Sequence, residues 1–397
     1  MKSIEQLPLE GRRVFIRVDF NAPVKNGRIT DATRIRAAKK TIQYAIGRGA
    51  KVILASHRGR PGGKLTPELT LGPIAEQLAE EIGQPVKLLP DCVGPEVEKA
   101  VAAMKPGEVV LLENLRFHAE EEKNDDAFAA SLARLCDVYV NDAFGAAHRA
   151  HASTAGMARH VADVGAGFLM FAEVEALGSL LHDPARPFVA VVGGAKVGDK
   201  IKLMRNLLGR VDALVVGGAM AYTFLHAKGV PVGASIVDDD NVALAADLLK
   251  DAASRGVTIA LPVDHVVARE FQERAPVSTT AGEAIEPGFM GLDIGPRTRE
   301  DFRALLLKAK TIFWNGPMGV FEWESSCAGT MAVANAVADS HAHSVIGGGD
   351  SVAALAKSGR SSEVTHVSTG GGASLEFLEG RELPGVAALD KASEVAA

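Results

Sequence analysis

The chain has 397 residues, more than one ordinary hydrophobic core accommodates, so two domains are expected. Its net charge of −6 argues against general binding to nucleic acid or to an anionic membrane, because such partners require a broad basic surface. Three widely spaced cysteines without a CxxC pair argue against a disulfide framework or a zinc knuckle, and no apolar run approaches the ~20 residues of a membrane span, so the predicted location is the cytoplasm.

The first half of the chain alternates apolar runs with helical patterns. The runs that predict strands are residues 13–20, 51–56, 86–89, 109–113 and 138–142. The helical patterns between them cover residues 32–46, 71–82, 96–104 and 127–135. Strands that alternate with helices of this length predict βαβ units and a mostly parallel sheet.

The second half repeats this scheme after an apolar helical stretch that ends in Asp-Pro-Ala-Arg-Pro. Its predicted strands are residues 188–192, 213–216, 258–261, 311–314, 344–346 and 366–368, and its predicted helices are 199–208, 242–253, 299–308 and 327–338. The expected fold is α/β, with two doubly wound Rossmann-like domains of mostly parallel sheets, joined by a linker helix and a hinge. The expected boundaries are residues 1–165, 166–183 and 184–379.

Arginine and histidine side chains follow several predicted strands of the first half. Ligands of open parallel sheets bind beyond the carboxyl ends of the strands, so these side chains are expected on one rim. The relevant segments are 19–21, 34–36, 56–61, 113–118 and 141–151. Guanidinium forks match phosphate and carboxylate groups, and the rim therefore predicts a small, highly anionic ligand. The alternative is that these arginines pair with nearby carboxylates at the surface.

Glycine turns end four apolar runs of the second half, at residues 193–194, 217–218, 347–349 and 370–372. Such turns let the backbone approach a ligand and leave helix N–H groups free for phosphate oxygens. Lys196 and Lys200 lie four residues apart and could hold a polyphosphate together, although Asp199 interrupts the P-loop pattern. No GxGxxG fingerprint opens the first strand-turn-helix of either half, which weakens a dinucleotide-binding hypothesis.

Two carboxylates of the second half have candidate roles. Glu322 follows the Asn315-Gly316-Pro317 turn and could bind a ribose hydroxyl. Asp350 follows three glycines at a predicted helix start, where it could lie near a phosphate-bound Mg²⁺ or act as an N-cap.

Motifs along the whole chain closely resemble those of the phosphoglycerate kinase family. In order they are RVDFN at 17–21, SHRGRP at 56–61, LENLRF at 112–117, NDAFG at 141–145 with HRAH at 148–151, GGAKV at 193–197, WNGP at 314–317, GGGD at 347–350 and STGGGA at 368–373. The sequence departs from the family pattern at Arg58, at Gly198 and at residues 325–327, and none of these differences removes a charged functional group.

The resemblance implies 3-phosphoglycerate on the first domain and Mg²⁺ with ADP or ATP on the second, in a monomeric enzyme of glycolysis and gluconeogenesis. The implied substrate-binding residues are Asp19, Phe20, Asn21, Arg34, His57, Arg58, Gly59, Arg60, Arg116 and Arg149. The implied nucleotide-binding residues are Lys196, Lys200, Gly291, Asn315, Glu322, Gly348, Gly349, Asp350 and Ser351, with Asp350 beside the metal. Residues from about 380 to 397 are expected to fold back onto the first domain.

The implied reaction is phosphoryl transfer between 1,3-bisphosphoglycerate and ADP. In the ATP-consuming direction the nucleophile is a carboxylate, which is ionised at neutral pH and needs no general base. Arg34 and Lys196 are predicted to stabilise the transferring charge, and hinge closure is predicted to bring the two ligands together. Two alternatives remain: a nicotinamide-dependent dehydrogenase, and a nucleotide-binding protein without catalysis.

Overall fold

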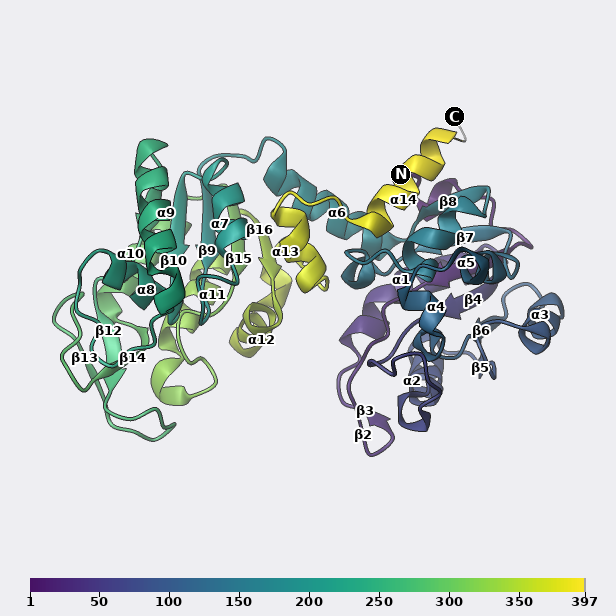
Figure 1. The fold of residues 1–397 in the computed structure, drawn as a ribbon, viewed down its shortest axis with the longest axis horizontal. Coiled ribbons are helices and arrows are strands. Elements are labelled where there is room, and N and C mark those ends of the chain that lie inside the picture. The colour runs from purple at the N-terminus through teal and green to yellow at the C-terminus, as the bar shows by residue number, and fades with distance from the viewer. Residues whose placement is uncertain (396–397) are drawn as a thin grey trace. The chain divides into compact units, whose positions relative to one another are not determined.

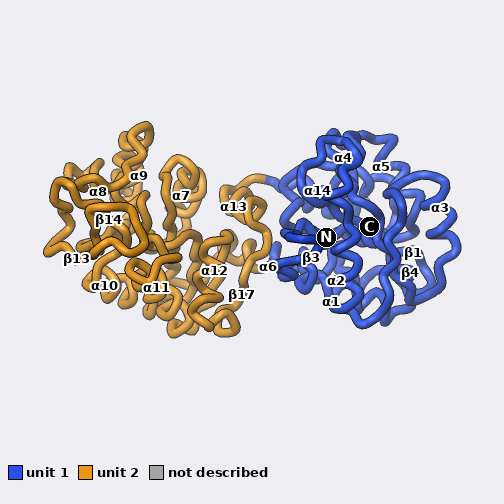
Figure 2. The backbone as a smooth tube through the Cα atoms, turned by 90° about the horizontal axis from the view of Figure 1, so that it is seen from below, with its two compact units in different colours: residues 1–175, 382–397 blue, residues 176–381 orange. Residues whose placement is uncertain are grey.

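The computed structural model describes residues 1–395 and divides into two compact units. Unit 1 comprises Met1–Glu175 together with the chain from Glu382 onward, and unit 2 comprises Ala176–Arg381 (Figure 2). Helix α6 (Phe168–Leu181) contains the point at which the chain passes from unit 1 to unit 2. The chain therefore changes unit twice.

Unit 1 is built on a six-stranded sheet in which every neighbouring pair is parallel. The strands, from one edge to the other, are β5 (Val86–Leu88), β6 (Val109–Leu111), β4 (Lys51–Ala55), β1 (Arg13–Arg17), β7 (Val138–Asn141) and β8 (Asp163–Ala166). The chain moves from β1 towards one edge and later returns to the other side of β1 at β7. The loops beyond the central strands β1, β4 and β7 therefore lie next to one another.

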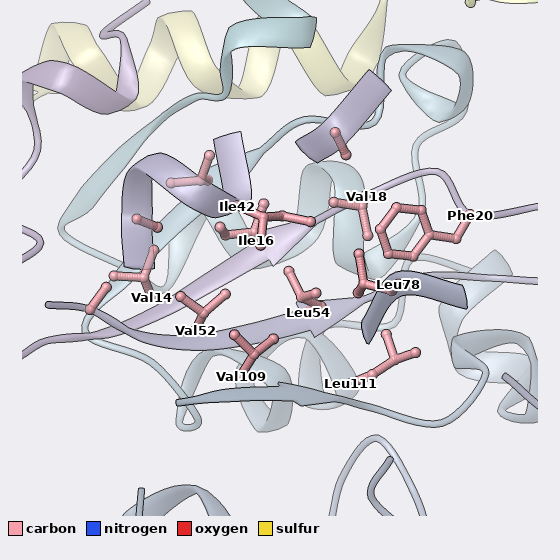
Figure 3. Packing of buried hydrophobic residues seen from close by; sticks show 14 of the residues in the cluster. Val14, Ile16, Val18, Phe20, Ile42, Val52, Leu54, Leu78, Val109 and Leu111 are labelled. Atoms are coloured by element: carbon pink, nitrogen blue, oxygen red, sulfur yellow. The ribbon is translucent and has the colours of Figure 1, made fainter. Parts of the chain in front are cut away.

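Helices cover the sheet of unit 1 and bury its apolar side chains. They are α1 (Thr33–Gly47), α2 (Gly72–Ile82), α3 (Pro95–Ala102), α4 (Ala119–Glu122), α5 (Asp126–Ala133) and α14 (Pro384–Val395). Alternate strand residues such as Ile16 and Leu54 point to the face covered by α1 and α2, where they meet Ile42 and Leu78 (Figure 3). This packing fixes the positions from which the strand-end loops leave.

Several short elements fill the connections of unit 1. A two-stranded hairpin of β2 (Val24–Lys25) and β3 (Arg28–Ile29) follows β1. Single turns of helix are η1 (Ile4–Gln6), η2 (Pro67–Leu69), η3 (Leu115–Phe117), η4 (Phe144–Ala146), η5 (Ala152–Gly156) and η6 (Met157–Arg159). Of these, η3 and η5 carry side chains of the candidate site.

Unit 2 contains a second six-stranded parallel sheet. Its order is β11 (Thr258–Ala260), β10 (Ala213–Val216), β9 (Phe188–Val192), β15 (Thr311–Asn315), β16 (His343–Gly347) and β17 (His366–Val367). This is the strand order of the dinucleotide-binding fold, whose switch point lies here between β9 and β15. The prediction of an α/β fold with doubly wound parallel sheets is confirmed.

The helices of unit 2 are α7 (Ile201–Leu208), α8 (Met220–Ala227), α9 (Val242–Ser254), α10 (Pro296–Leu306), α11 (Ala328–Asp339), α12 (Gly349–Ser358) and α13 (Gly372–Leu378), with single turns η7 (Asp239–Asn241), η8 (Glu324–Ser326) and η9 (Ser361–Glu363). Helices α10, α11 and α12 bury their apolar faces against one side of the sheet. A small antiparallel sheet of β13 (Val277–Thr279), β12 (His265–Ala268) and β14 (Met290–Ile294) extends the unit (Figure 1). The sequence did not predict this antiparallel sheet.

The C-terminal helix α14 belongs to unit 1. Leu383 and Leu389 are buried, and the amino group of Met1 lies 2.8 Å from a carboxylate oxygen of Asp390. Of the segment expected to fold back, residues 396 and 397 lie outside the described chain. Within the described residues, every helix is too short or too polar to cross a membrane.

Candidate active site

The loop after β1 and the first turns of α1 supply an ion pair to the candidate site of unit 1. Arg34 donates from Nη1 to Oδ2 of Asp19 over 2.7 Å. Burial acts to raise the pKa of Asp19, but its surroundings, the His57 ring and the guanidinium groups of Arg34 and Arg17, lower it overall. Asp19 therefore remains ionised and orients the Arg34 guanidinium.

His57 follows β4 and is a buried, neutral imidazole. Burial lowers its pKa well below the ordinary value, Asp19 opposes that shift, and Arg17 and Arg116 reinforce it. Nη2 of Arg17 lies 3.1 Å from Nδ1 of His57. Because a guanidinium can only donate, Nδ1 accepts and we assign the ring proton to Nε2. His57 thus presents one N–H donor, and the guanidinium groups carry the charge that stabilises Asp19.

A buried hydrogen-bond chain holds Arg17 in place. Its Nε donates to Oγ of Ser153 over 2.8 Å, and that hydroxyl donates to Glu121 over 2.5 Å. The backbone N–H of Ser153 also donates to Glu121 at 2.9 Å. All three side chains are fully buried, and burial raises the pKa of Glu121. Arg17 is therefore fixed between a buried carboxylate chain on one side and His57 on the other.

Asn114 joins the loops that follow β4 and β6. Its Oδ1 accepts from the N–H groups of Arg58 and Arg116, each over 3.1 Å. Its Nδ2 donates to the carbonyl oxygens of Arg58 at 2.8 Å and Leu69 at 3.0 Å. One buried amide thereby sets the relative position of two predicted substrate segments.

Gly59 connects the same two loops to the loop after β1. Its N–H donates to Oδ1 of Asn21 over 3.0 Å, and its carbonyl accepts from Nη1 of Arg116 over 2.8 Å. A φ of +63° favours glycine at this position, where a Cβ would lie 2.8 Å from a methyl group of Leu69. Burial lowers the pKa of Arg116, Glu122 opposes this shift from 3.3 Å away, and the charges of Arg17 and Arg149 act in the same direction as burial. Like charges are thus held close together here.

Two predicted substrate residues direct their side chains elsewhere. Phe20 is fully buried in the hydrophobic core beside Leu78 (Figure 3). Arg58 is also buried, and its Nη1 donates to the carbonyl of Thr70 over 2.9 Å. Their backbone groups are paired as well: the N–H of Phe20 donates to Oγ of Ser56, and the N–H and carbonyl of Arg58 both bind Asn114. Arg60, in contrast, is exposed.

The turns after β9 and β15 meet at the switch point of unit 2. The N–H of Gly193 donates to the carbonyl of Asn315 over 2.9 Å. A Cβ on Gly193 would lie 2.0 Å from the carbonyl oxygen of Pro317. A side chain at position 193 would force the backbone to shift, so glycine at this position keeps the two turns in contact.

Lys200 lies immediately before α7 and joins these turns from the inside. Its Nζ donates to the carbonyls of Gly193 at 2.6 Å and Asn315 at 3.0 Å. Burial lowers its pKa to about 8, while Asp350 and Asp199 oppose the shift. The lysine that the sequence predicts at a helix start therefore also has a structural role.

Asn315 and Gly348 connect the turns after β15 and β16. Nδ2 of Asn315 donates to the carbonyl of Gly347 over 2.8 Å. Gly348 has a φ of +88°, and a Cβ there would lie 2.7 Å from Nδ2 of Asn315. The backbone turns sharply at this point and enters α12.

The first residues of α12 divide into exposed and buried groups. Gly349 and Asp350 are exposed at the start of the helix. Ser351 is fully buried, and its hydroxyl accepts from the N–H of Gly316. The structure thus leaves Asp350 available to solvent and commits the Ser351 side chain to holding the turn after β15.

The remaining predicted nucleotide residues lie farther along the chain. Lys196 and Glu322 are exposed. Gly291 lies in β14, where its N–H donates to Oγ of Ser235 over 2.9 Å. A Cβ on Gly291 would lie 1.9 Å from the hydroxyl of Tyr222, so this strand and α8 are in close contact.

The sequence did not single out the side chains that organise the rim. Arg17, Asn114, Glu121 and Ser153 are buried polar residues contributed by four separate segments. Arg17 is the last residue of β1 and Asn114 lies in the loop after β6, and both belong to the predicted motifs, so their place at strand ends was a usable signal. Glu121 and Ser153 carry no such signal.

An arginine-rich rim in one α/β unit and close-packed glycine turns at the switch point of the other are the arrangement expected of a phosphotransferase that acts between a small anion and a nucleotide. A family model described as phosphoglycerate kinase matches residues 4–381. The chain belongs to the phosphoglycerate kinase family. Its activity is reversible phosphoryl transfer between 1,3-bisphosphoglycerate and ADP, with a carboxyl group as acceptor in the ATP-consuming direction.

Curated relatives and solved structures give the same result. The chain is 57% identical over 387 residues to the phosphoglycerate kinase of Moorella thermoacetica, covering 98% of both chains. It is 58% identical over 396 residues to that of Anaeromyxobacter dehalogenans strain 2CP-1, covering 98% of this chain and 100% of the relative. The structure of phosphoglycerate kinase from Coxiella burnetii superposes with a TM-score of 0.91 at 44% identity, covering 98% of this chain and 99% of that one.

Proposed function

We propose that unit 1 binds the three-carbon acid and unit 2 binds the magnesium nucleotide. The observation that carries this division is the convergence of positive charge in unit 1. Arg17, Arg34 and Arg116 all act electrostatically on buried His57, and Arg149 acts on Arg116. A phosphate and a carboxylate on one small ligand would relieve the repulsion within this cluster.

The proposed substrate contacts follow from which donors remain available. Nε2 of His57 is assigned as a free donor because Nδ1 accepts from Arg17. Arg34 is partly exposed, and Arg60 is exposed. The backbone around Phe20 and Arg58 shapes the rim, while Asn21, Gly59, Arg116 and Arg149 complete it.

The nucleotide is proposed to bind at the switch point between β9 and β15. Four features support this location: the order of the strands, the close-packed glycine turns, Lys200 between them, and the exposed start of α12. Lys196, Gly291, Asn315 and Glu322 are proposed to complete the nucleotide site.

Asp350 fits the role of a magnesium contact. Its carboxylate is exposed beside the glycine turn, and Mg²⁺ in such sites takes one or two carboxylates together with substrate phosphates. When bound with the nucleotide, the ion would neutralise phosphate charge. Ser351 would act on the nucleotide site indirectly, because its hydroxyl accepts a hydrogen bond from the N–H of Gly316 and so holds the turn after β15.

Catalysis is proposed to rest on positioning and charge neutralisation, without a general base. The acceptor carboxylate is already ionised at neutral pH. Arg34 from unit 1 and Lys196 from unit 2 are proposed to stabilise the charge of the transferring group. Because each ligand is assigned to a different unit, the units must approach one another during the reaction, and water would be excluded from the reacting groups.

A coupled assay for ATP-dependent phosphorylation of 3-phosphoglycerate tests the proposal. Replacing Arg34 by Ala is expected to lower kcat by roughly 10²–10³, the scale for losing one preorganised donor. Arg36→Ala is the matched control, because Arg36 lies on the same helix and pairs with Glu81 away from Asp19. An unchanged kcat for the Arg34 variant would remove that residue from the mechanism.

Small-angle scattering tests the approach of the units. A decrease in the radius of gyration is expected only when both ligands are present. Equal radii in all ligand states would contradict the closure step but leave the two binding assignments intact.

We further propose a cytoplasmic monomer with neither nucleic acid nor membrane as a partner. The net charge of −6 supports the lack of broad polyanion binding. Sedimentation of the purified chain would test the oligomeric state directly.

A further inference from the structure

Three residues with metal-binding side chains meet in unit 1 outside the cluster of guanidinium groups. Asp91 and Cys92 lie in the loop between β5 and α3, and His118 follows η3. These loops leave the carboxyl ends of β5 and β6, which are neighbours in the sheet. The backbone N–H of Glu113 donates to the carbonyl of Asp91 and links the two loops directly.

The ligand atoms of this cluster are close enough to share one ion. A carboxylate oxygen of Asp91, the sulfur of Cys92 and a ring nitrogen of His118 all lie within 4.8 Å of one another. Oδ1 of Asp91 is 2.7 Å from Nε2 of His118 and accepts from the N–H of Cys92 at 2.6 Å. An ion between these atoms would require only small side-chain movements, because metal–ligand bonds of about 2.0–2.3 Å hold ligand atoms slightly farther apart than a hydrogen bond does.

The three side chains differ in exposure, so a cation could enter from solvent and reach a sulfur that is shielded from water. Cys92 is fully buried, whereas the side chains of Asp91 and His118 are 47% and 29% exposed. A cation could enter between the carboxylate and the imidazole and meet the sulfur beneath them. Solvent could supply a fourth ligand from the open side. The His118 ring packs on Phe128, with centroids 5.3 Å apart, which holds its orientation.

The donor set selects the class of metal. One sulfur, one nitrogen and one oxygen ligand suit Zn²⁺ or Co²⁺, whereas Mg²⁺ prefers oxygen ligands only. We propose that Asp91, Cys92 and His118 form a binding site for a divalent transition metal of the zinc type. The site is independent of the magnesium proposed at Asp350, and it does not rest on the proposed division of substrates between the units.

Metal binding at this position would stabilise the loop that carries part of the guanidinium cluster. Arg116 lies two residues before His118 in the same segment, where Asn114 already caps η3. An ion would add a cross-link between that segment and the loop after β5. The expected consequence is a higher unfolding temperature of unit 1 that rises with metal concentration, because ligand binding stabilises the folded state by mass action.

Cobalt spectroscopy of the full-length chain, first freed of metal with a chelator, tests the proposal. One equivalent of Co²⁺ is expected to produce a near-ultraviolet sulfur-to-cobalt charge-transfer band. Zn²⁺ should abolish this band, and excess Mg²⁺ should leave it unchanged. Calorimetric titration with Zn²⁺ should show that His118→Ala lowers the affinity for the ion. The decrease should exceed the roughly 10–100-fold loss that follows when a residue contacting only a metal ligand is removed.

Matched variants separate this cluster from other groups. His160→Ala removes a histidine that pairs with a carboxylate, Asp126, at 2.9 Å but does not belong to the Asp91, Cys92 and His118 cluster. Cys327→Ser removes a thiol that is more exposed than that of Cys92. Both variants should keep the cobalt band, and Cys92→Ala should lose it while the far-ultraviolet circular dichroism stays unchanged. The proposal is overturned if wild type gives no band, or if the band survives loss of Cys92 or His118.

Discussion

Arg17 is the buried residue on which the proposed anion site depends. Its Nη2 contacts Nδ1 of His57, and its Nε reaches Glu121 through the hydroxyl of Ser153. A buried guanidinium is tolerated only when its donors are paired, and this chain of contacts satisfies that condition. The residue that selects the His57 tautomer therefore depends on partners from η5 and α4.

Replacing Ser153 by Ala should interrupt this chain. The substitution leaves Nε of Arg17 and one oxygen of Glu121 without the bridging hydroxyl in a buried site, which is expected to lower the free energy of unfolding by about 1–3 kcal/mol. Denaturant unfolding measures the loss, and the ¹⁵N shifts of His57 report whether its tautomer changes.

Ser131→Ala is the control for that experiment. Its hydroxyl donates to the carbonyl of Ala127 within α5 at a partly exposed position, so its loss should cost no more than about 0.5 kcal/mol. Equal effects of the two substitutions would mean that the buried chain contributes no special stability.

Helix α6 begins at a buried carboxylate that follows β7. Oδ1 of Asp142 accepts from the N–H of Met170 over 3.0 Å, while Oδ2 is buried without a hydrogen-bond partner. Burial raises the pKa of Asp142 to about 7. Burial favours the protonated form, whereas the Thr41 side chain and the backbone N–H groups of Met170 and Leu169 at the helix N-terminus favour the charged form.

Asp142→Asn should therefore change how stability depends on pH. The folded-state pKa lies above the ordinary value near 3.8, so the stability that protonated Asp142 provides is complete below pH 4 and is lost as pH rises to about 7. The unfolding free energy of the variant minus that of wild type should grow across this range by several kcal/mol, on the order of 1.4 per pKa unit, and then stay level. Calorimetry between pH 4 and 8 would measure the difference.

Asp137→Asn provides a control that should show no slope in this range. Hydrogen bonding by Arg13 lowers the pKa of Asp137 below its ordinary value near 3.8, so its contribution to stability is constant between pH 4 and 8 and is lost only on further acidification. A pH-independent difference for the Asp142 variant would show that this carboxyl titrates normally.

The second prediction at the scale of an element concerns Gly193 in the turn after β9. Gly193→Ala places a methyl group against the carbonyl oxygens of Pro317 and Gly316, so the two turns at the switch point must separate. We expect a loss of about 1–3 kcal/mol in the stability of unit 2 and at least a ~10-fold weaker affinity for ADP.

Gly282→Ala is the matched glycine substitution. Gly282 lies between β13 and β14, outside the predicted nucleotide-binding turns, where an added methyl group would meet no atom within 4 Å and the backbone does not require a positive φ. Normal ADP affinity in the Gly193 variant, measured by calorimetric titration beside this control, would contradict the role assigned to the turn.

The elements that the sequence predicted are those with a continuous apolar run or a clear helical periodicity. The central parallel strands of both units and helices such as α1 and α9 were predicted close to their observed positions. Strand β8 was missed because it is four residues long and contains Gly165. Helix α8 was missed because Met220 to Leu225 are all buried, so the segment has no polar face to reveal its period.

The candidate site also contains residues that the sequence identified and residues that it could not identify. Residues in strand-end motifs were identifiable because parallel sheets gather their carboxyl ends on one rim. The orientation of Arg58 towards Thr70, and the burial of Ser351, follow from neighbours distant in sequence and could not be read locally. The Asp91, Cys92 and His118 cluster was also invisible, since it depends on β5 lying beside β6.

At the scale of the whole molecule, α14 completes unit 1 rather than unit 2. Leu389 is fully buried in unit 1, so Leu389→Ala is expected to destabilise that unit by about 2–5 kcal/mol. Calorimetric scans should show a lower transition temperature for one unit, with ADP affinity within about twofold of wild type.

Lys391→Ala, at an exposed position of the same helix, is the control. A parallel fall in nucleotide affinity for the Leu389 variant would indicate that the helix also supports unit 2.

The double crossing of the chain between units sets an order of events during biosynthesis. Unit 2 is one uninterrupted segment, whereas α14 of unit 1 emerges from the ribosome only after all of unit 2 has been made. Unit 2 can therefore complete its folding first. The earlier-made half must wait with its apolar groove for α14 uncovered, and during this interval it is the part of the nascent chain most in need of chaperone protection.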